Sequence, residues 1–161
     1  MHNFKVDTFI KIIFLVSLVS IISAYFIEYV LGHQPCNLCL IERIPYGLSI
    51  ILIILNYFLK NNEKFIILLL IKIFVFSLII SLYHFGIEQG YFEESTVCGL
   101  KSAAEIISKD EILKQLQEKT ISCKDVTFKV FGLSLTSINI FISFILTVLL
   151  TKTFISYEKN K

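Results

Sequence analysis

The hydrophobic positions of this chain gather into four long runs separated by polar segments. The runs cover about residues 9–30, 44–59, 65–85 and 133–151, and they lack the alternation of apolar and polar residues found in barrel strands. A helix needs about 20 apolar residues to cross a hydrocarbon core roughly 30 Å thick. Because backbone amides inside a bilayer need internal partners, the pattern predicts four membrane-spanning helices.

Composition indicates the same class of protein. Hydrophobic residues make up 55% of the 161 residues and charged residues 17%, and the mean hydropathy is +0.76, whereas a soluble domain would carry more charge. We therefore expect an all-α membrane protein, a four-transmembrane-helix bundle that forms one domain over residues 1–161 in a lipid bilayer. No nucleic-acid partner is expected. The first run is too long for a signal peptide and lacks a clear cleavage site, so we expect it to be retained.

The connections between the runs differ in length and set the topology. A loop over 31–43 joins the first two runs, a tight turn over 60–64 joins the next two, and a long loop over 86–132 precedes the last. An even number of crossings puts both termini on one side and the two longer loops on the other. Lysines close to the membrane at the termini and the turn favour a cytoplasmic location for that side. Both longer loops are then expected to be periplasmic.

The long loop contains one further predicted element. Residues Ser102 to Glu105 resemble a capping box, and apolar residues then recur at roughly helical spacing as far as Leu116. We expect a short amphipathic helix at this place. It would either lie flat on the bilayer or the bundle, or form a surface for a partner.

Four cysteines are the candidates for chemistry. Cys36 and Cys39 form a Cys-x-x-Cys pair at the start of the second run, whereas Cys98 and Cys123 lie in the long loop, where we expect them to be reachable from water. Two pairs in one compartment outside the cytoplasm are enough for thiol–disulfide exchange. A purely structural disulfide is an alternative, although closing a two-residue loop stabilises little. Zinc is another, but the downstream spacing is unlike a zinc motif, and no metal site is expected.

Charged and titratable residues flank these cysteines. Arg43 lies four residues beyond Cys39, where it would either favour a thiolate or simply extend to the interface from a helix end. Glu42 is either its ion partner or a solvated cap. His84 and Glu88 fall at the outer end of the third run. His84 is either an interfacial histidine or part of a proton relay, since histidine titrates near neutral pH.

Two segments resemble a known family. Residues 34–43 read QPCNLCLIER and residues 83–90 read YHFGIEQG, and two loop cysteines follow. Together with the order of the cysteines and the helix count, they resemble the DsbB family of quinone-linked, disulfide-forming membrane proteins. The resemblance extends from about Tyr25 to the end of the fourth run. The chain departs from better-known members in lacking tryptophan, and the segment between the loop cysteines has no obvious signature.

The resemblance implies a direction of electron flow. A periplasmic DsbA-like, thioredoxin-fold thiol oxidase would pass two electrons to the Cys98/Cys123 disulfide, and these would continue to Cys36/Cys39. A membrane quinone, ubiquinone or menaquinone, would be the final acceptor. The resemblance also implies that Cys98 forms the mixed disulfide with the partner, that Cys39 contacts the quinone and that Arg43 assists at the ring, where a cation would stabilise developing negative charge.

On this interpretation the protein is a protein-thiol:quinone oxidoreductase of the bacterial inner membrane that supports disulfide bond formation. The rivals are a variant dedicated to one specialised substrate and a non-catalytic membrane scaffold with a structural loop disulfide. The predicted catalytic residues are Cys36, Cys39, Cys98 and Cys123, and the predicted quinone-site residues are Arg43, His84 and Glu88.

Overall fold

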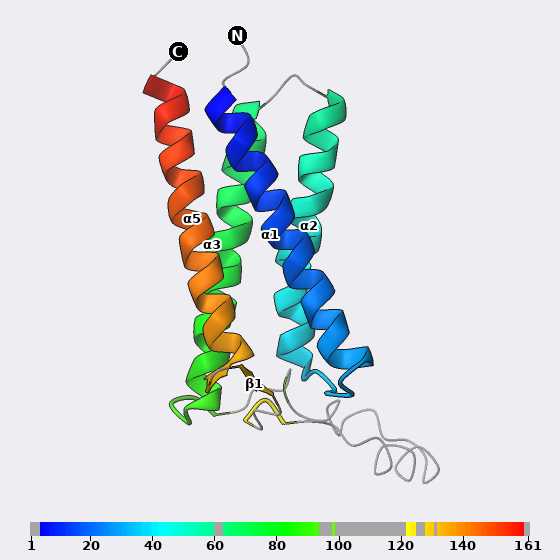
Figure 1. Ribbon diagram of the computed structural model, residues 1–161. Helices are drawn as coiled ribbons and strands as arrows, with labels where there is room; N and C mark the ends of the chain where they lie inside the picture. The colour runs from blue at the N-terminus through cyan, green and yellow to red at the C-terminus, as the bar shows by residue number, and fades with distance from the viewer. Residues whose placement is uncertain are drawn as a thin grey trace, which may run out of the picture.

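A computed structural model describes residues 4–59, 63–93, 98, 122–124, 128–130 and 132–159. Four long helices make up most of this part of the chain: α1 (Phe4–Tyr29), α2 (Asn37–Leu59), α3 (Glu63–Glu88) and α5 (Leu135–Lys159). All four are long and apolar enough to cross a membrane. They run side by side as a bundle (Figure 1), so the prediction of an all-α, four-span membrane protein is confirmed.

The two ends of the bundle differ in what they carry. The start of α1 and the end of α5 lie together at one end, and the α1–α2 connection lies at the other (Figure 1). A small antiparallel hairpin of β1 (Lys129–Val130) and β2 (Leu133–Ser134) also lies at that second end, directly before α5. Gly132 in its turn has a φ of 83°, a conformation that glycine adopts without a steric penalty.

Packing is centred on α3, which packs most extensively against α5 and also against α2, while α1 packs mainly against α2. Buried serines lie between the helices: Ser49 donates a hydrogen bond to Ser17 over 2.8 Å, and Ser77 and Ser143 are hydrogen-bonded over 2.9 Å. Small side chains let helices approach closely in lipid, where apolar burial alone does not drive association. The bundle is therefore held by close contact and interhelical hydrogen bonds.

The start of α2 differs from the start of the apolar run. The helix begins at Asn37, whereas the apolar run begins near residue 44, so part of the predicted loop 31–43 is helical. Glu42 and Arg43 interrupt the run of apolar side chains, but the helical backbone continues through them. The Cys36 thiol accepts the backbone N–H of Cys39 over 3.3 Å, in the manner of a capping side chain. This extension places Cys39 and Arg43 on a rigid helix.

The end of α3 is also fixed by its local sequence. Gly90 adopts a φ of 77°, its N–H donates to the Ile87 carbonyl over 3.0 Å, and the Tyr91 N–H donates to the Gly86 carbonyl over 2.8 Å. This is a Schellman C-cap, which requires a left-handed residue at the glycine. The Phe92 ring then folds back so closely on Gly86 that a Cβ atom there would lie 2.3 Å from it. The predicted amphipathic helix near 102–116 lies outside the described residues.

Candidate active site

All four cysteines meet at the hairpin end of the bundle. Cys98 and Cys123 form a disulfide, while Cys36 and Cys39 are free thiols with their Sγ atoms 2.8 Å apart. Cys36, Cys98 and Cys123 are buried in one cluster with Ile87, and Cys39 packs against it. The fold therefore brings together two pairs that are far apart in the sequence.

The burial of the loop disulfide differs from the exposure expected for it. Cys98 and Cys123 are only 3% and 2% exposed, because the disulfide packs against Cys36 and Ile87 at the end of the bundle. A position in a long loop predicts solvent access only when the loop extends into solvent. Here both cysteines are buried against the end of the bundle, so a partner must gain access to the disulfide before the disulfide can react.

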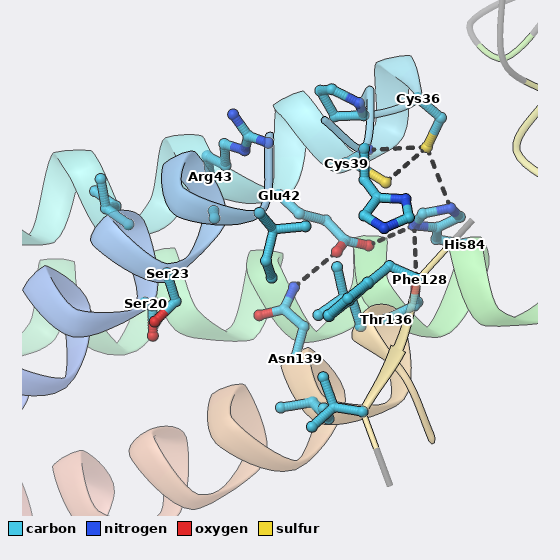
Figure 2. Close-up of a pocket in the computed structure, with 18 of the residues that line it drawn as sticks. Ser20, Ser23, Cys36, Cys39, Glu42, Arg43, His84, Phe128, Thr136 and Asn139 are labelled. Carbon is cyan, nitrogen blue, oxygen red and sulfur yellow. Dashed lines mark hydrogen bonds and ion pairs between the residues drawn. The ribbon is translucent and has the colours of Figure 1, made fainter. Parts of the chain in front are cut away.

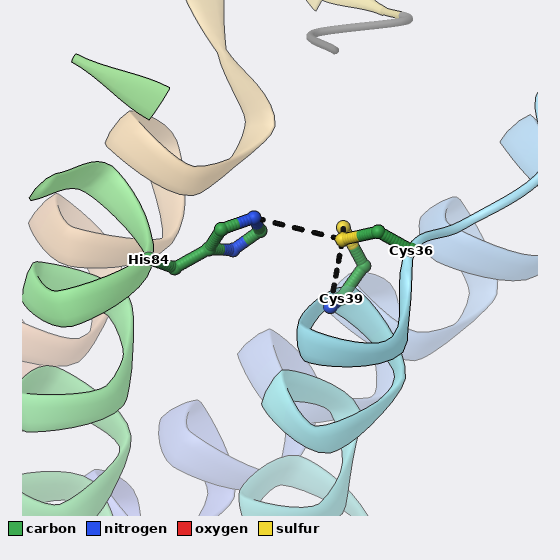
Figure 3. Close-up of side chains that lie close together, drawn as sticks. All are labelled: Cys36, Cys39 and His84. Carbon is green, nitrogen blue, oxygen red and sulfur yellow. Dashed lines mark hydrogen bonds between the residues drawn. The ribbon is translucent and has the colours of Figure 1, made fainter. Parts of the chain in front are cut away.

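Cys36 is the activated thiol of its pair. It lies immediately before α2, and its Sγ is close to the Cys39 thiol and 3.5 Å from Nε2 of His84 (Figure 3). Hydrogen bonding by the Cys39 thiol lowers the pKa of Cys36 most, and hydrogen bonding by His84 lowers it further, against the opposing effect of burial. The positive end of the helix dipole acts in the same direction. Cys36 therefore carries the thiolate when the pair is reduced.

His84 is held by residues from two other helices. It is only 1% exposed, and its Nδ1 lies 2.9 Å from Oε1 of Glu42 on α2 and 3.2 Å from the Thr136 hydroxyl on α5 (Figure 2). A carboxylate at Nδ1 keeps a proton on that nitrogen and points Nε2 at Cys36. The Thr136 hydroxyl also donates to Oε1 of Glu88 over 2.6 Å. The imidazole is thus fixed in a position to exchange a proton with Cys36.

Asn139 of α5 completes the support of Glu42. Its Nδ2 donates to Oε2 of Glu42 over 2.9 Å and to Ser81 over 2.8 Å, and its Oδ1 accepts a hydrogen bond from the Tyr46 hydroxyl. Sequence analysis missed both Asn139 and Thr136. The available signal was their polarity, three residues apart near the start of the last hydrophobic run, since polar residues within membrane helices often mark functional sites.

Arg43 has a different partner from the one considered in the sequence. Its guanidinium pairs with Glu28 of α1 and lies 5.2 Å from the centre of the Tyr25 ring. Glu42, by contrast, is 8% exposed and bonded to His84, so it is neither the ion partner of Arg43 nor a solvated cap. Consecutive residues of a helix point in directions about 100° apart, which explains why the two side chains face different neighbours.

A pocket of about 360 Å³ opens beside the cysteine pair, within the size range of sites for small organic molecules. Its apolar lining includes Val19 and Ile27 of α1 and Ile142 of α5. Oε2 of Glu88 is buried and has no hydrogen-bond partner among the described residues. Six of the seven predicted site residues line this pocket, all except Cys98: Cys36, Cys39, Arg43, His84, Glu88 and Cys123.

Comparison with known proteins gives a consistent result. The family model for disulfide bond formation protein DsbB matches residues 7–153. An uncharacterized protein of Rickettsia prowazekii (strain Madrid E) is 26% identical over 148 residues, covering 91% of this chain and 86% of that protein. No solved structure shows significant similarity. With four helices and two cysteine pairs at one end of the bundle, the match over nearly the whole chain means that this protein belongs to the DsbB family of membrane oxidoreductases that form disulfide bonds.

Proposed function

We propose that this protein is a protein-thiol:quinone oxidoreductase that reoxidises a periplasmic DsbA-like, thioredoxin-fold protein. The observation that carries the proposal is the buried cluster that joins the Cys98–Cys123 disulfide to Cys36, directly beside a pocket with apolar walls. Electrons would enter at the loop disulfide and leave through the pocket. The bilayer that surrounds the bundle would be the bacterial inner membrane, with the cysteine end on the periplasmic side.

The first step is disulfide exchange with the partner. A partner thiolate attacks Sγ of Cys98, the Cys98–Cys123 bond breaks, and Cys123 leaves as a thiolate. The second partner thiol then attacks its own neighbour in the mixed disulfide and releases Cys98. The partner has lost two electrons and gained a disulfide, and the loop pair has become a dithiol. The choice of Cys98 as the attacked sulfur rests on the family resemblance.

The second step transfers the electrons within the protein. The Cys123 thiolate attacks Sγ of Cys36 in a Cys36–Cys39 disulfide, and Cys39 leaves as a thiolate. The Cys98 thiolate then attacks Cys123 in the Cys123–Cys36 bond, which releases Cys36 and restores the loop disulfide. Burial of Cys36 in the same cluster as Cys98 and Cys123 supports this route. The products are a closed loop disulfide and a reduced Cys36/Cys39 pair, which is the arrangement of bonds described above.

The third step returns the Cys36/Cys39 pair to a disulfide and reduces a quinone, ubiquinone or menaquinone, to its quinol. Two electrons and two protons leave the thiols. The pocket fits this substrate in size and in its apolar lining, and Cys39 lines it. Arg43 is also in the lining, where its charge would stabilise negative charge on a quinone oxygen. His84 faces Cys36 through Nε2 and can hold the proton that this thiol loses, and Oε2 of Glu88, which has no hydrogen-bond partner among the described residues, can accept a hydrogen bond from a hydroxyl of the quinol product.

The full chain, purified and reconstituted in lipid nanodiscs, tests this function. Reduced thioredoxin-fold partner is added with a soluble ubiquinone or menaquinone analogue, and quinone absorbance is followed together with partner thiols. We expect one quinone to be consumed for each partner disulfide formed. Oxidation of the partner without quinone consumption would contradict the proposed acceptor.

The orientation is tested separately. Intact spheroplasts are reduced and treated with a mild denaturant that exposes buried cysteines but leaves the membrane sealed. A membrane-impermeant thiol reagent should then label all four cysteines. The denaturant is needed because the cysteines are buried. Labelling that requires permeabilised membranes would place the cysteine end on the cytoplasmic side.

A further inference from the structure

Three soft donor atoms converge at the start of α2. The thiols of Cys36 and Cys39 and an imidazole nitrogen of His84 lie within 4.8 Å of one another. Figure 3 shows the ring pointing at the two sulfurs from α3. The two Sγ atoms are 2.8 Å apart, and Nε2 of His84 is 3.5 Å from Sγ of Cys36. Thiolate and imidazole together are the donor set preferred by zinc and other thiophilic cations.

The spacing of these donors fits a tetrahedral ion after a small adjustment. With metal–sulfur bonds of about 2.3 Å and metal–nitrogen bonds of about 2.0 Å, neighbouring ligands are separated by roughly 3.5–3.8 Å. The distance from Cys36 to His84 already matches. The two sulfurs would move apart by about 1 Å, to the separation that Cys-x-x-Cys pairs adopt in zinc sites.

The surroundings of His84 strengthen this reading. Its Nδ1 is bonded to Glu42, and Glu42 is bonded in turn to Asn139, so the ring is oriented by a carboxylate on the side away from the sulfurs. Ligating histidines in metalloproteins are supported in the same way. All three donor residues line the pocket, which leaves room for water at a fourth position.

We propose that the reduced site binds a divalent thiophilic cation, of the Zn²⁺ or Cd²⁺ class, through Cys36, Cys39 and His84. No electrons move on binding: the thiols lose the protons they still hold, and two metal–sulfur bonds form. A Cys36–Cys39 disulfide has no thiolate to offer, so binding is confined to the reduced state and blocks exchange while it lasts. The inference depends on the proposed function only because exchange is what supplies the dithiol.

Cd²⁺ is the probe for the first test. The full chain carrying Cys98→Ser and Cys123→Ser is reduced in detergent micelles without quinone or partner, and CdCl₂ is titrated while the ultraviolet thiolate-to-cadmium absorption is recorded. We expect saturation at one Cd²⁺ per reduced chain and no absorption change for chain oxidised to the Cys36–Cys39 disulfide. Equal responses of the two redox forms would overturn the proposal.

Unsubstituted protein provides a second measurement if the double variant does not fold. With the loop disulfide intact, Cd²⁺ should protect both Cys36 and Cys39 from alkylation, as read by mass spectrometry, and a chelator should remove the protection. Alkylation at an unchanged rate contradicts the site. Because neither assay contains quinone, a failure of quinone reduction and a failure of metal binding are separate results.

Histidine variants distinguish this site from a cysteine pair acting alone. Loss of an outer partner of a ligand typically weakens binding about 10–100-fold, so Glu42→Gln should weaken Cd²⁺ binding about tenfold. His84→Gln removes the ligand itself and should weaken Cd²⁺ binding at least tenfold. His33→Gln is the matched control, since His33 packs against Phe128 and is not among the converging donors. If His84→Gln retains its helical circular dichroism and still binds Cd²⁺ as tightly as the parent, the three-donor site is wrong.

Discussion

The cysteine end and the opposite end of the bundle use the same helices but bury different side chains. At the end near the termini the core is a cluster of aliphatic and aromatic residues, with Ile67, Leu70 and Phe74 of α3 packed against Leu146 and Leu150 of α5. We call this the apolar end. The residues of that cluster include no charged side chain. The polar groups beside it are few: Ser77 and Ser143 bond to each other, Thr153 bonds to its own helix, and a longer contact of 3.4 Å joins Ser143 to the Tyr46 hydroxyl.

At the cysteine end, the same two helices bury a connected polar network. His84 of α3 meets Thr136 and Asn139 of α5, and α2 contributes Glu42. A polar group left unpaired in such a place costs far more than a lost apolar contact, because its desolvation is no longer offset. Chemistry at the cysteine end therefore depends on unique polar partners, whereas packing at the apolar end tolerates substitutions that keep volume.

Substitution of Cys36 should interrupt the proposed relay and cause the greatest loss of activity. Cys36→Ser removes the sulfur that receives electrons from the loop pair in the proposed relay, so the variant with quinone present should oxidise one equivalent of reduced partner and then stop. Single-turnover assays of partner thiols measure this directly. Ile67→Val, at the apolar end, should keep multiple turnover. Continued turnover by Cys36→Ser would contradict the relay.

The lowered pKa of Cys36 gives the second prediction. A thiol whose pKa is depressed remains a thiolate as the pH falls, so alkylation of reduced Cys36 by iodoacetamide should be nearly as fast at pH 6 as at pH 8. An ordinary thiol slows about tenfold per pH unit in this range, or about 100-fold in total. The unfolded chain in denaturing detergent is the internal control. A steep decline in the folded protein would show that neither Cys39 nor His84 stabilises the thiolate.

The third prediction removes one member of the polar network without touching a sulfur. Asn139→Leu leaves Oε2 of Glu42 and the Tyr46 hydroxyl without the partner they have now, so Glu42 should no longer hold His84 in place. We expect kcat to fall about 10–100-fold, as for a misplaced catalytic group, with less effect on the KM for quinone. A shifted pH profile of kcat would mark a positioning role.

Leu146→Ile, seven residues further along α5, is the matched control for Asn139→Leu. Leu146 belongs to the apolar end, and the substitution conserves volume. Its kcat and pH profile should be those of the parent. Equal losses in the two variants would mean that α5 contributes packing alone, and that the two ends do not differ in the way described.

Arg43→Lys tests the pocket more gently. The change keeps the charge but loses the planar group that pairs with Glu28 and faces Tyr25. A weakened charge-assisted contact costs on the order of 1 kcal/mol, so the apparent KM for quinone should rise about fivefold with the protein still inserted. Lys152→Arg at the other end should change nothing. Unchanged quinone kinetics in Arg43→Lys would leave only an interfacial role for the guanidinium.

Much of the fold could be predicted because membrane spans are marked by local composition. Each apolar run identifies a helix without reference to the others, and parity then places the two cysteine loops at one end. The start of α2 was harder to predict, since Glu42 and Arg43 interrupt the apolar run although the helix already begins at Asn37. Its helical state depends on backbone hydrogen bonding and on the cap provided by Cys36, which hydropathy does not detect.

The site was predictable only as far as its residues are close in sequence or belong to the family motifs. Partners across helices were not: Arg43 pairs with Glu28, and Glu42 pairs with His84 and Asn139. The side chains of α1, α3 and α5 are apolar on nearly all sides of each helix, so the sequence does not indicate which helix faces pack together. Isolated polar residues were the remaining clue, and they identify candidates but not their partners.

Ser17→Ala tests where the border between the two ends lies, and we expect only a small change in stability. Ser17 is fully buried and accepts the hydrogen bond of Ser49, whose hydroxyl is also shared with the Tyr46 carbonyl, one step from the polar network. Interhelical hydrogen bonds in membrane proteins average about 0.6 kcal/mol, so Ser17→Ala should lower stability by roughly that amount. Because Ser49 keeps its backbone acceptor, partner oxidation and quinone reduction should remain at parental rates. Unfolding in increasing concentrations of denaturing detergent measures the stability, and the coupled assay measures turnover. A loss of turnover in a normally stable variant would mean that the network extends through Ser49 to α1, and that the border lies closer to the termini than the contacts indicate.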